Sequence, residues 1–150
     1  MNVKVLLAYD GFEHSRQALE ETAELAAEGR SEVTILSVVP EDDAGASKAG
    51  GHRMMAPHAH QDVASAHQHL RERGIESEMK IAHGAPLDEI VREAETGGYD
   101  LVVVGSRGLG PVGRLILGSV SERLVLRSPV PVLVAGSDTT ERHEPVAATD

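Results

Sequence analysis

Hydrophobic residues occur along the chain in blocks of two kinds, separated by glycine, proline and polar residues. Blocks of the first kind are short and rich in valine, isoleucine and leucine, which is typical of buried strands. The block at 76–82 alternates apolar with polar residues, so we expect it near a sheet edge. Strands are predicted over residues 3–9, 32–39, 76–82, 101–104 and 129–135.

Blocks of the second kind carry apolar residues three and four positions apart, the spacing of one helix face. Ser15 suits the N-cap of the first block, and Pro86 suits the first turn of the third. Residues 41–57 are small and polar, and they predict an excursion outside the core. Helices are predicted over residues 15–30, 58–73, 86–95 and 120–127.

The alternation of strands with helices indicates the α/β class, with right-handed crossovers onto a parallel sheet that has helices on both faces. In such sheets, ligands bind at the carboxyl ends of strands where the winding direction reverses. Asp10, Val38 and Gly105 lie at or beside such ends. We predict one domain over residues 1–136 and a polar, disordered tail over 137–150.

The amino-acid composition of the chain restricts the kinds of molecule that it can bind. Hydrophobic residues make up 41% of the chain but aromatic residues only 2%, so the core is aliphatic and rings that stack nucleic-acid bases are scarce. A formal net charge of -10 repels nucleic-acid backbones and anionic membranes. The absence of cysteine excludes disulfides and thiolate chemistry. The short apolar run at the N-terminus ends at an acid, so it predicts a strand rather than a signal peptide, and a cytoplasmic protein is expected.

The stretch from Gly105 to Ser119 is the richest in candidate chemistry. It contains five glycines and two arginines, and it joins a buried strand to a helix. Glycines let backbone N–H groups turn toward an anion, and a helix N-terminus adds a partial positive charge. Tight turning alone also calls for glycines, but their number together with the arginines favours phosphate binding.

Three phosphate-binding motifs can be compared with this stretch. A Walker A loop needs a lysine before its serine or threonine, whereas Gly118 is followed directly by Ser119. Residues 108–113 match G-x-G-x-x-G, but only one strand follows and it lacks the expected acid, so a dinucleotide site is disfavoured. The third motif, G-x2-G-x9-G-[ST], fits Gly105, Gly108, Gly118 and Ser119.

This third spacing resembles the glycine signature of the ATP-binding branch of the universal stress protein family. The resemblance implies a Rossmann-like fold of the adenine nucleotide alpha hydrolase type, a five-stranded parallel sheet of order 3-2-1-4-5. It covers nearly the whole chain, from Val3 to Ala135. Other matching segments, in the same order, are Ala8 to Gly11 followed by Ser15, Gly84 to Pro86 before a helix with Ile90, Tyr99-Asp100, and Pro131 to Val134.

Carried over by position, the resemblance implies an ATP site, with Mg²⁺ or Mn²⁺ accompanying the nucleotide. It implies that Asp10 lies near the ribose or the metal, that Val38 frames the adenine and that Val120 lends a backbone N–H. One departure is Phe12, where the family usually has a small hydroxyl residue nearby. The implied nucleotide-binding residues are Ala8, Tyr9, Asp10, Val38, Gly105, Arg107, Gly108, Gly118, Ser119 and Val120, with Asp10 also the metal ligand.

Some of these residues have simpler interpretations. An acid after a strand is most often a turn residue or a helix cap, and Asp10 fits that role as well as a ligand role. Arg107 and Arg114 are either solvated or used as phosphate forks, and Arg107 is the better candidate.

A metal site made of histidines is disfavoured. Residues two apart on a helix do not share a face, so neither H-x-H pair chelates one ion from a helix, and no carboxylate or thiolate partner is evident. A solvated helix is the favoured interpretation. The histidines concerned are His58, His60, His67 and His69.

The favoured function is a stress-response or signalling module that binds ATP, with at most slow hydrolysis, because no catalytic lysine or Ser/His/Asp arrangement is evident. A nucleotide-hydrolysing or adenylyl-transferring enzyme on the same fold is the alternative, and a ligand-free interaction protein is a third. No nucleic-acid or membrane partner is expected. The resemblance further implies a homodimer through the last strand, at Pro131, Val132, Leu133 and Val134.

Overall fold

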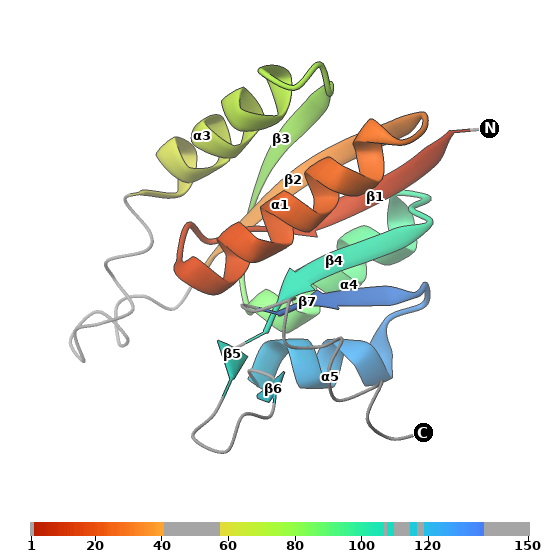
Figure 1. The fold of residues 1–150 in the computed structure, drawn as a ribbon. Helices are drawn as coiled ribbons and strands as arrows, with labels where there is room; N and C mark the ends of the chain where they lie inside the picture. Colours follow the sequence, from red (N-terminus) through yellow and green to blue (C-terminus); the bar gives the residue numbers. More distant parts are fainter. Residues whose placement is uncertain (1, 41–57, 107, 110–114, 117–118, 137–150) are drawn as a thin grey trace.

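The fold is built on one parallel sheet of five strands (Figure 1). The computed structural model describes residues 2–40, 58–106, 108–109, 115–116 and 119–136. The order and direction of the strands confirm the predicted sheet. Across the sheet, the strands are β3 (Ser77–His83), β2 (Ser31–Val39), β1 (Val3–Ala8), β4 (Leu101–Gly105) and β7 (Val132–Ala135).

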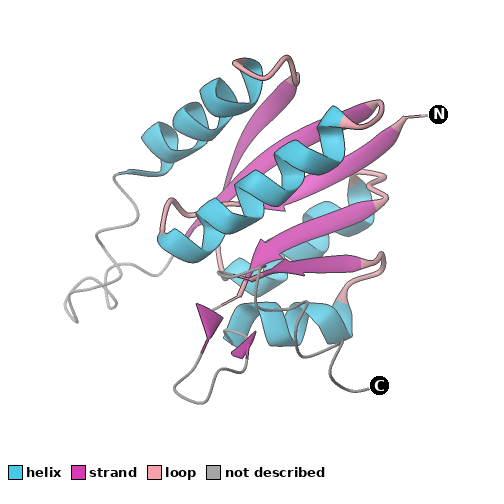
Figure 2. Cartoon of the chain, viewed as in Figure 1, coloured by secondary structure: helices cyan, strands magenta, loops and turns pink. Residues whose placement is uncertain are grey.

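Helices cover both faces of this sheet, as predicted (Figure 2). The helices α1 and α3 pack on one face, and α4 and α5 pack on the other (Figure 1). No helix in the described ranges is long and apolar enough to cross a membrane. The helices are α1 (Glu13–Ala27), α3 (Ala59–Arg71), α4 (Pro86–Thr96) and α5 (Ser119–Arg127).

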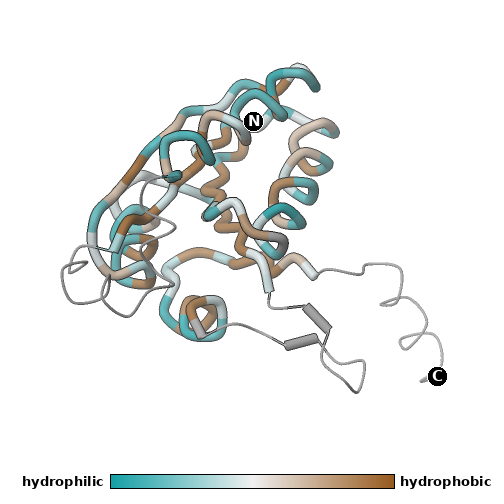
Figure 3. Tube along the Cα trace, turned by 90° about the vertical axis from the view of Figure 1, so that its left-hand side faces the viewer, coloured by the Kyte–Doolittle hydropathy of each residue, from teal (hydrophilic) through white to brown (hydrophobic). Residues whose placement is uncertain are grey.

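The hydrophobic core is divided by the sheet into two clusters, because successive side chains of a strand point to opposite faces. In β1, Leu7 packs in the cluster under α1 and α3, and Leu6 packs in the cluster under α4 and α5. Both side chains are fully buried. Hydrophobic residues are concentrated where the strands and helices face one another (Figure 3). The central strands β1 and β4 are accordingly rich in aliphatic residues, as buried parallel strands require, whereas the edge strand β3 alternates polar and apolar residues.

The central strand β1 marks the point where the winding of the chain reverses. The first two crossovers carry the chain from β1 to β2 and β3 on one side, and the later ones carry it to β4 and β7 on the other. Leu7 pairs in register with Ile35 of β2 and with Val103 of β4. The carboxyl ends of β1 and β4 therefore meet at the switch point, where ligands bind in sheets of this kind.

Three local features differ from the sequence-based expectation. The helix α1 begins at Glu13, ahead of Ser15. The strand β7 begins at Val132 rather than at residue 129, since prolines 129 and 131 have no N–H for the ladder. A two-stranded antiparallel ribbon, β5 (Gly108–Leu109) with β6 (Leu115–Ile116), was not predicted. The segment at 41–57 and the tail at 137–150 lie outside the described residues.

Candidate functional site

The turn between β1 and α1 places a carboxylate at the switch point. Gly11 has a φ of 85°, a conformation that favours glycine and turns the chain sharply away from the sheet. The Phe12 N–H donates to Asp10 Oδ1 at 2.9 Å, so the carboxylate closes the turn in which it lies. Asp10 is a turn residue, and its position at the edge also makes it available to a ligand.

Ser15 completes this turn from inside α1. Its hydroxyl accepts hydrogen bonds from the N–H groups of Asp10 and Gly11, at 3.2 Å and 3.1 Å, and donates to Asp10 Oδ1 at 2.8 Å. The prediction that Ser15 is the N-cap is wrong, because the helix begins earlier and Phe12 occupies the cap position without a side-chain hydrogen bond. The serine instead fixes the backbone and the carboxylate of Asp10 together.

The Asp10 carboxylate is held in its ionised form. Burial raises its pKa, but hydrogen bonds from His14, the Phe12 N–H and Ser15 outweigh burial and hold the pKa below its usual range. The His14 Nε2 lies 3.2 Å from Asp10 Oδ2. The turn therefore presents a negative charge at the carboxyl edge.

Gly105, at the end of β4, lies directly against the start of α1. A Cβ at this position would overlap the backbone carbonyl of His14 and would lie 3.0 Å from the Ser15 N. Any side chain here would force α1 away from the sheet. Gly105 thus has a packing role, whatever its role toward phosphate, and it joins the turn of Asp10 to the strand before the glycine-rich stretch.

The glycine-rich stretch itself is described only in part. Ser106 is buried, and its N–H donates to the carbonyl of Ala135 at 2.9 Å. Gly108 lies in β5 and pairs with Ile116. Ser119 is the first residue of α5, and Val120 packs partly buried against the cluster under α4 and α5. Two further predicted residues, Arg107 and Gly118, lie outside the described residues, as does Arg114.

The remaining predicted residues are divided between the two faces of the sheet. Ala8 and Val38 are partly buried on the face covered by α4 and α5. Tyr9 is buried on the opposite face, where its hydroxyl hydrogen-bonds with Arg16. Burial raises the pKa of Tyr9, and Arg16 partly offsets this rise. Ala8, Asp10, Val38 and Gly105 thus lie at the carboxyl edge. The ring of Tyr9 instead packs in the core cluster under α1 and α3.

Asp62, near the start of α3, also lies at this edge and was not predicted. A Cβ on Gly11 would lie 2.6 Å from Asp62 Oδ1, so the two residues are in close contact. Burial raises the pKa of Asp62, and the nearby Asp10 raises it further, while His58 and Arg16 oppose both effects. Asp62 could have been found from its position in the sequence, because a helix that follows a parallel strand begins at the carboxyl edge of the sheet.

The histidines of α3 connect this helix to neighbouring elements. His67 Nδ1 lies 2.7 Å from Ser77 Oγ of β3, and His69 Nε2 lies 2.9 Å from Glu20 Oε2 of α1. Within the described ranges, no group of three histidine, aspartate or glutamate side chains is arranged to hold a metal ion. The Asp10 carboxylate, which is ionised at this edge, is the predicted ligand that could supply one oxygen to a Mg²⁺ ion.

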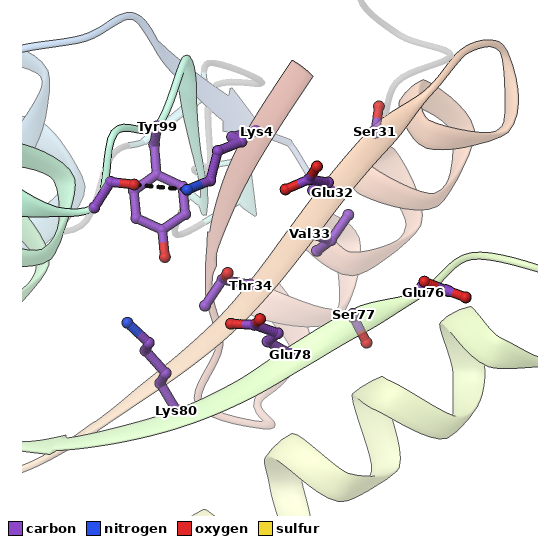
Figure 4. Close-up of a pocket in the computed structure, with 11 residues that line it drawn as sticks. Lys4, Ser31, Glu32, Val33, Thr34, Glu76, Ser77, Glu78, Lys80 and Tyr99 are labelled. Carbon is purple, nitrogen blue, oxygen red and sulfur yellow. Dashed lines mark hydrogen bonds between the residues drawn. The ribbon is translucent and has the colours of Figure 1, made fainter. Parts of the chain in front are cut away.

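A polar hollow of ≈ 340 Å³ lies at the other end of the sheet, near the starts of β1, β2 and β3 (Figure 4). Both lysines that line it have hydrogen-bond partners. Lys4 Nζ donates to the carbonyl of Gly97 at 2.7 Å and lies 5.1 Å from the centre of the Tyr99 ring. Glu93 Oε2 accepts from both Lys80 Nζ and the Tyr99 hydroxyl, at 2.7 Å and 2.8 Å. The hollow is distant from the switch point, and we assign the candidate site to the carboxyl edge.

Comparison with known proteins adds independent findings. The sequence model of the Universal stress protein family matches residues 1–136. Universal stress protein YxiE of Bacillus subtilis is 32% identical over 143 residues, which cover 87% of this chain and 97% of YxiE. The solved structure of protein MJ0577 has a TM-score of 0.73 at 26% identity, and the match covers 91% of this chain and 97% of that one. A universal stress protein solved in complex with cAMP has a TM-score of 0.69 at 25% identity, with 91% and 98% covered.

Proposed function

The chain belongs to the universal stress protein family, and from that premise we propose that it binds an adenine nucleotide, ATP in particular, at the carboxyl ends of β1 and β4. The observation that carries the proposal is the place of Asp10, a charged carboxylate at the switch point, in a turn packed against Gly105. A relative of 25% identity was solved in complex with cAMP, which is also an adenine nucleotide.

The phosphates are assigned to the glycine-rich stretch that follows β4. Its G-x2-G-x9-G-S spacing supports this assignment, together with the start of α5 at Ser119. The first N–H groups of a helix have no partners within the helix, and they favour an anion. Bound Mg²⁺ would neutralise phosphate charge beside Asp10, which would supply one carboxylate oxygen.

The role we propose is nucleotide sensing in the stress response rather than turnover. No lysine follows Gly118, so the stretch lacks the cation that P-loop enzymes place on the transferred phosphate. The alternative is a nucleotide-hydrolysing or adenylyl-transferring enzyme. Metal-dependent release of phosphate or pyrophosphate over many turnovers would favour that alternative, and an inert complex would exclude it.

Titration calorimetry tests nucleotide binding directly. We expect the protein to bind ATP in the presence of Mg²⁺ and expect Gly118→Asp, which adds a like charge beside the phosphates, to weaken binding at least tenfold. Gly29→Asp, at the end of α1 and in open space, is the matched control and leaves affinity unchanged. Parallel titrations with AMP and cAMP rank the ligands. Absence of binding at millimolar nucleotide would refute the proposal.

We also propose a homodimer through β7, the strand at one edge of the sheet. Among the described residues no strand pairs with its outer side, and Val132, Leu133 and Val134 are only partly buried. On the neighbouring α5, the side chain of Val125 is also exposed. An unpaired edge strand of apolar residues is a template for pairing with a second copy.

A further inference from the structure

The two oxygens of the Asp10 carboxylate have different surroundings. Oδ1 accepts from the Phe12 N–H at 2.9 Å and from the Ser15 hydroxyl at 2.8 Å, so it is used by the turn. Oδ2 has a different neighbour, the His14 Nε2 at 3.2 Å. The Asp10 side chain is 30% exposed, and that of His14 is 42% exposed. Oδ1 is therefore engaged by two donors of the turn, whereas Oδ2 has the partly exposed imidazole of His14 as its neighbour.

The His14 ring is also held from a second side. It stacks on the ring of Phe12, with the centroids 6.4 Å apart and the planes at 19°. Phe12 is the single phenylalanine of the chain, and its side chain is exposed, whereas both tyrosines are buried. The stack and the contact with Asp10 together restrain the imidazole over Oδ2.

The other charged groups around Asp10 do not offer the same contact. Asp62 approaches Gly11 from α3 and repels the Asp10 carboxylate. Arg16, one turn into α1, hydrogen-bonds with the Tyr9 hydroxyl. Of the side chains described at this edge, His14 is thus the one within hydrogen-bond distance of Asp10 Oδ2.

We propose that His14 occupies the position on Asp10 Oδ2 that the nucleotide takes, so that binding requires the imidazole to turn away. This inference rests on the proposed function. The nucleotide would reach Oδ2 with a donor or cation in either of two ways, through a ribose hydroxyl or through its metal ion. In both cases His14 lowers the affinity of the site, because its contact with Asp10 is lost on binding. Phe12 strengthens the effect by holding the ring in place.

Calorimetry of MgATP binding to three variants tests this competition. We expect His14→Ala to bind about two- to fivefold more tightly than the wild type, the range for loss of one partly exposed side-chain pair. Phe12→Ser, which removes the stack and leaves a good helix N-cap, should give a smaller gain in affinity. His69→Ala removes a histidine–carboxylate pair elsewhere and is the matched control, with unchanged affinity. Thermal melts confirm that each variant is folded.

The outcomes separate this inference from the function on which it rests. Equal or weaker binding by His14→Ala, with clear binding by the wild type, overturns the inference and leaves the function intact. Absence of binding by both proteins overturns both proposals. Repeating the titrations with EDTA identifies the group that replaces the imidazole. A gain that persists without metal points to the ribose hydroxyl, and a gain that disappears points to the metal ion.

Discussion

Gly105 lies so close to the start of α1 that an added Cβ would overlap the His14 carbonyl. The contact gives Gly105 a packing role against α1 that the sequence did not predict, because spacing along the chain does not reveal which backbone passes over a strand end. The same limit applies to Asp62, which reaches the carboxyl edge from another helix. Asp10, by contrast, could be predicted, since a carboxylate directly after a buried strand is placed by the strand itself.

At Gly105, an added methyl group tests the packing role without any ligand. We expect Gly105→Ala to lower the free energy of unfolding by about 1–3 kcal/mol, because the methyl group overlaps the His14 carbonyl. Gly29→Ala, where a Cβ would meet nothing within 4 Å, should stay within about 0.5 kcal/mol of the wild type. Urea unfolding monitored by circular dichroism measures both variants. Equal stability of the two would show that the contact at Gly105 relaxes without cost.

Glu93 makes the free energy of unfolding depend on pH in the acidic range. Burial raises its pKa, but hydrogen bonds from Lys80 and Tyr99 outweigh burial and hold the pKa below its usual value. The folded state therefore binds this proton less readily than the unfolded chain. Glu93 contributes stability above the unfolded pKa, and the contribution is lost as the pH falls through the folded pKa.

We accordingly expect Glu93→Gln to flatten the fall in unfolding free energy between about pH 5 and about pH 3. Glu95→Gln, at an exposed carboxylate of the same helix, should leave the slope unchanged and serves as the control. Urea titrations at a series of pH values give the slopes. A wild-type slope retained in Glu93→Gln would assign the acid dependence to other carboxylates, such as Asp10.

At the scale of helices and strands, hydrophobic periodicity was sufficient for the main elements. All five strands of the main sheet and the four helices in the described part of the chain were predicted, with most boundaries within two residues. The start of α1 was missed because it depends on the side chain of Asp10 rather than on periodicity. The ribbon of β5 and β6 was missed because two-residue strands have no periodicity to read.

The helix α5 is short, and few of its side chains pack against the sheet. Leu124 is fully buried in the cluster shared with α4, whereas Leu126 is 82% exposed. We expect Leu124→Ala to lower the unfolding free energy by about 2–5 kcal/mol and Leu126→Ala to change it by less than about 0.5 kcal/mol. Chemical denaturation compares the two variants. Similar losses would mean that the helix packs in another orientation.

At the scale of the whole molecule, the two clusters of the core give each face of the sheet its own helix pair. The candidate site is formed by elements from both ends of the chain. The turn between β1 and α1 supplies Asp10, and β4 and α5 supply the two ends of the glycine-rich stretch. Its location could be predicted from the strand order alone. The contacts of His14 could not, because they depend on side-chain conformations.

Light scattering tests the proposed dimer at the same scale. We expect the wild type to have twice the 15.9 kDa mass of one chain, and Val134→Lys to have the mass of one chain, because a charge on β7 prevents edge pairing. Met79→Lys, an equivalent change at the exposed edge strand β3, should remain a dimer. A monomeric wild type would refute the proposed assembly.

The two edges of the sheet also bear on how many copies the proposed assembly would contain. Along β3, the outermost strand opposite β7, Glu78 and Lys80 alternate with apolar residues and discourage the approach of another strand. In the proposed dimer, two copies would pair through β7 and leave the charged strand β3 at each end of the joined sheet. The proposed assembly would then end at two copies and would not extend into open-ended fibres.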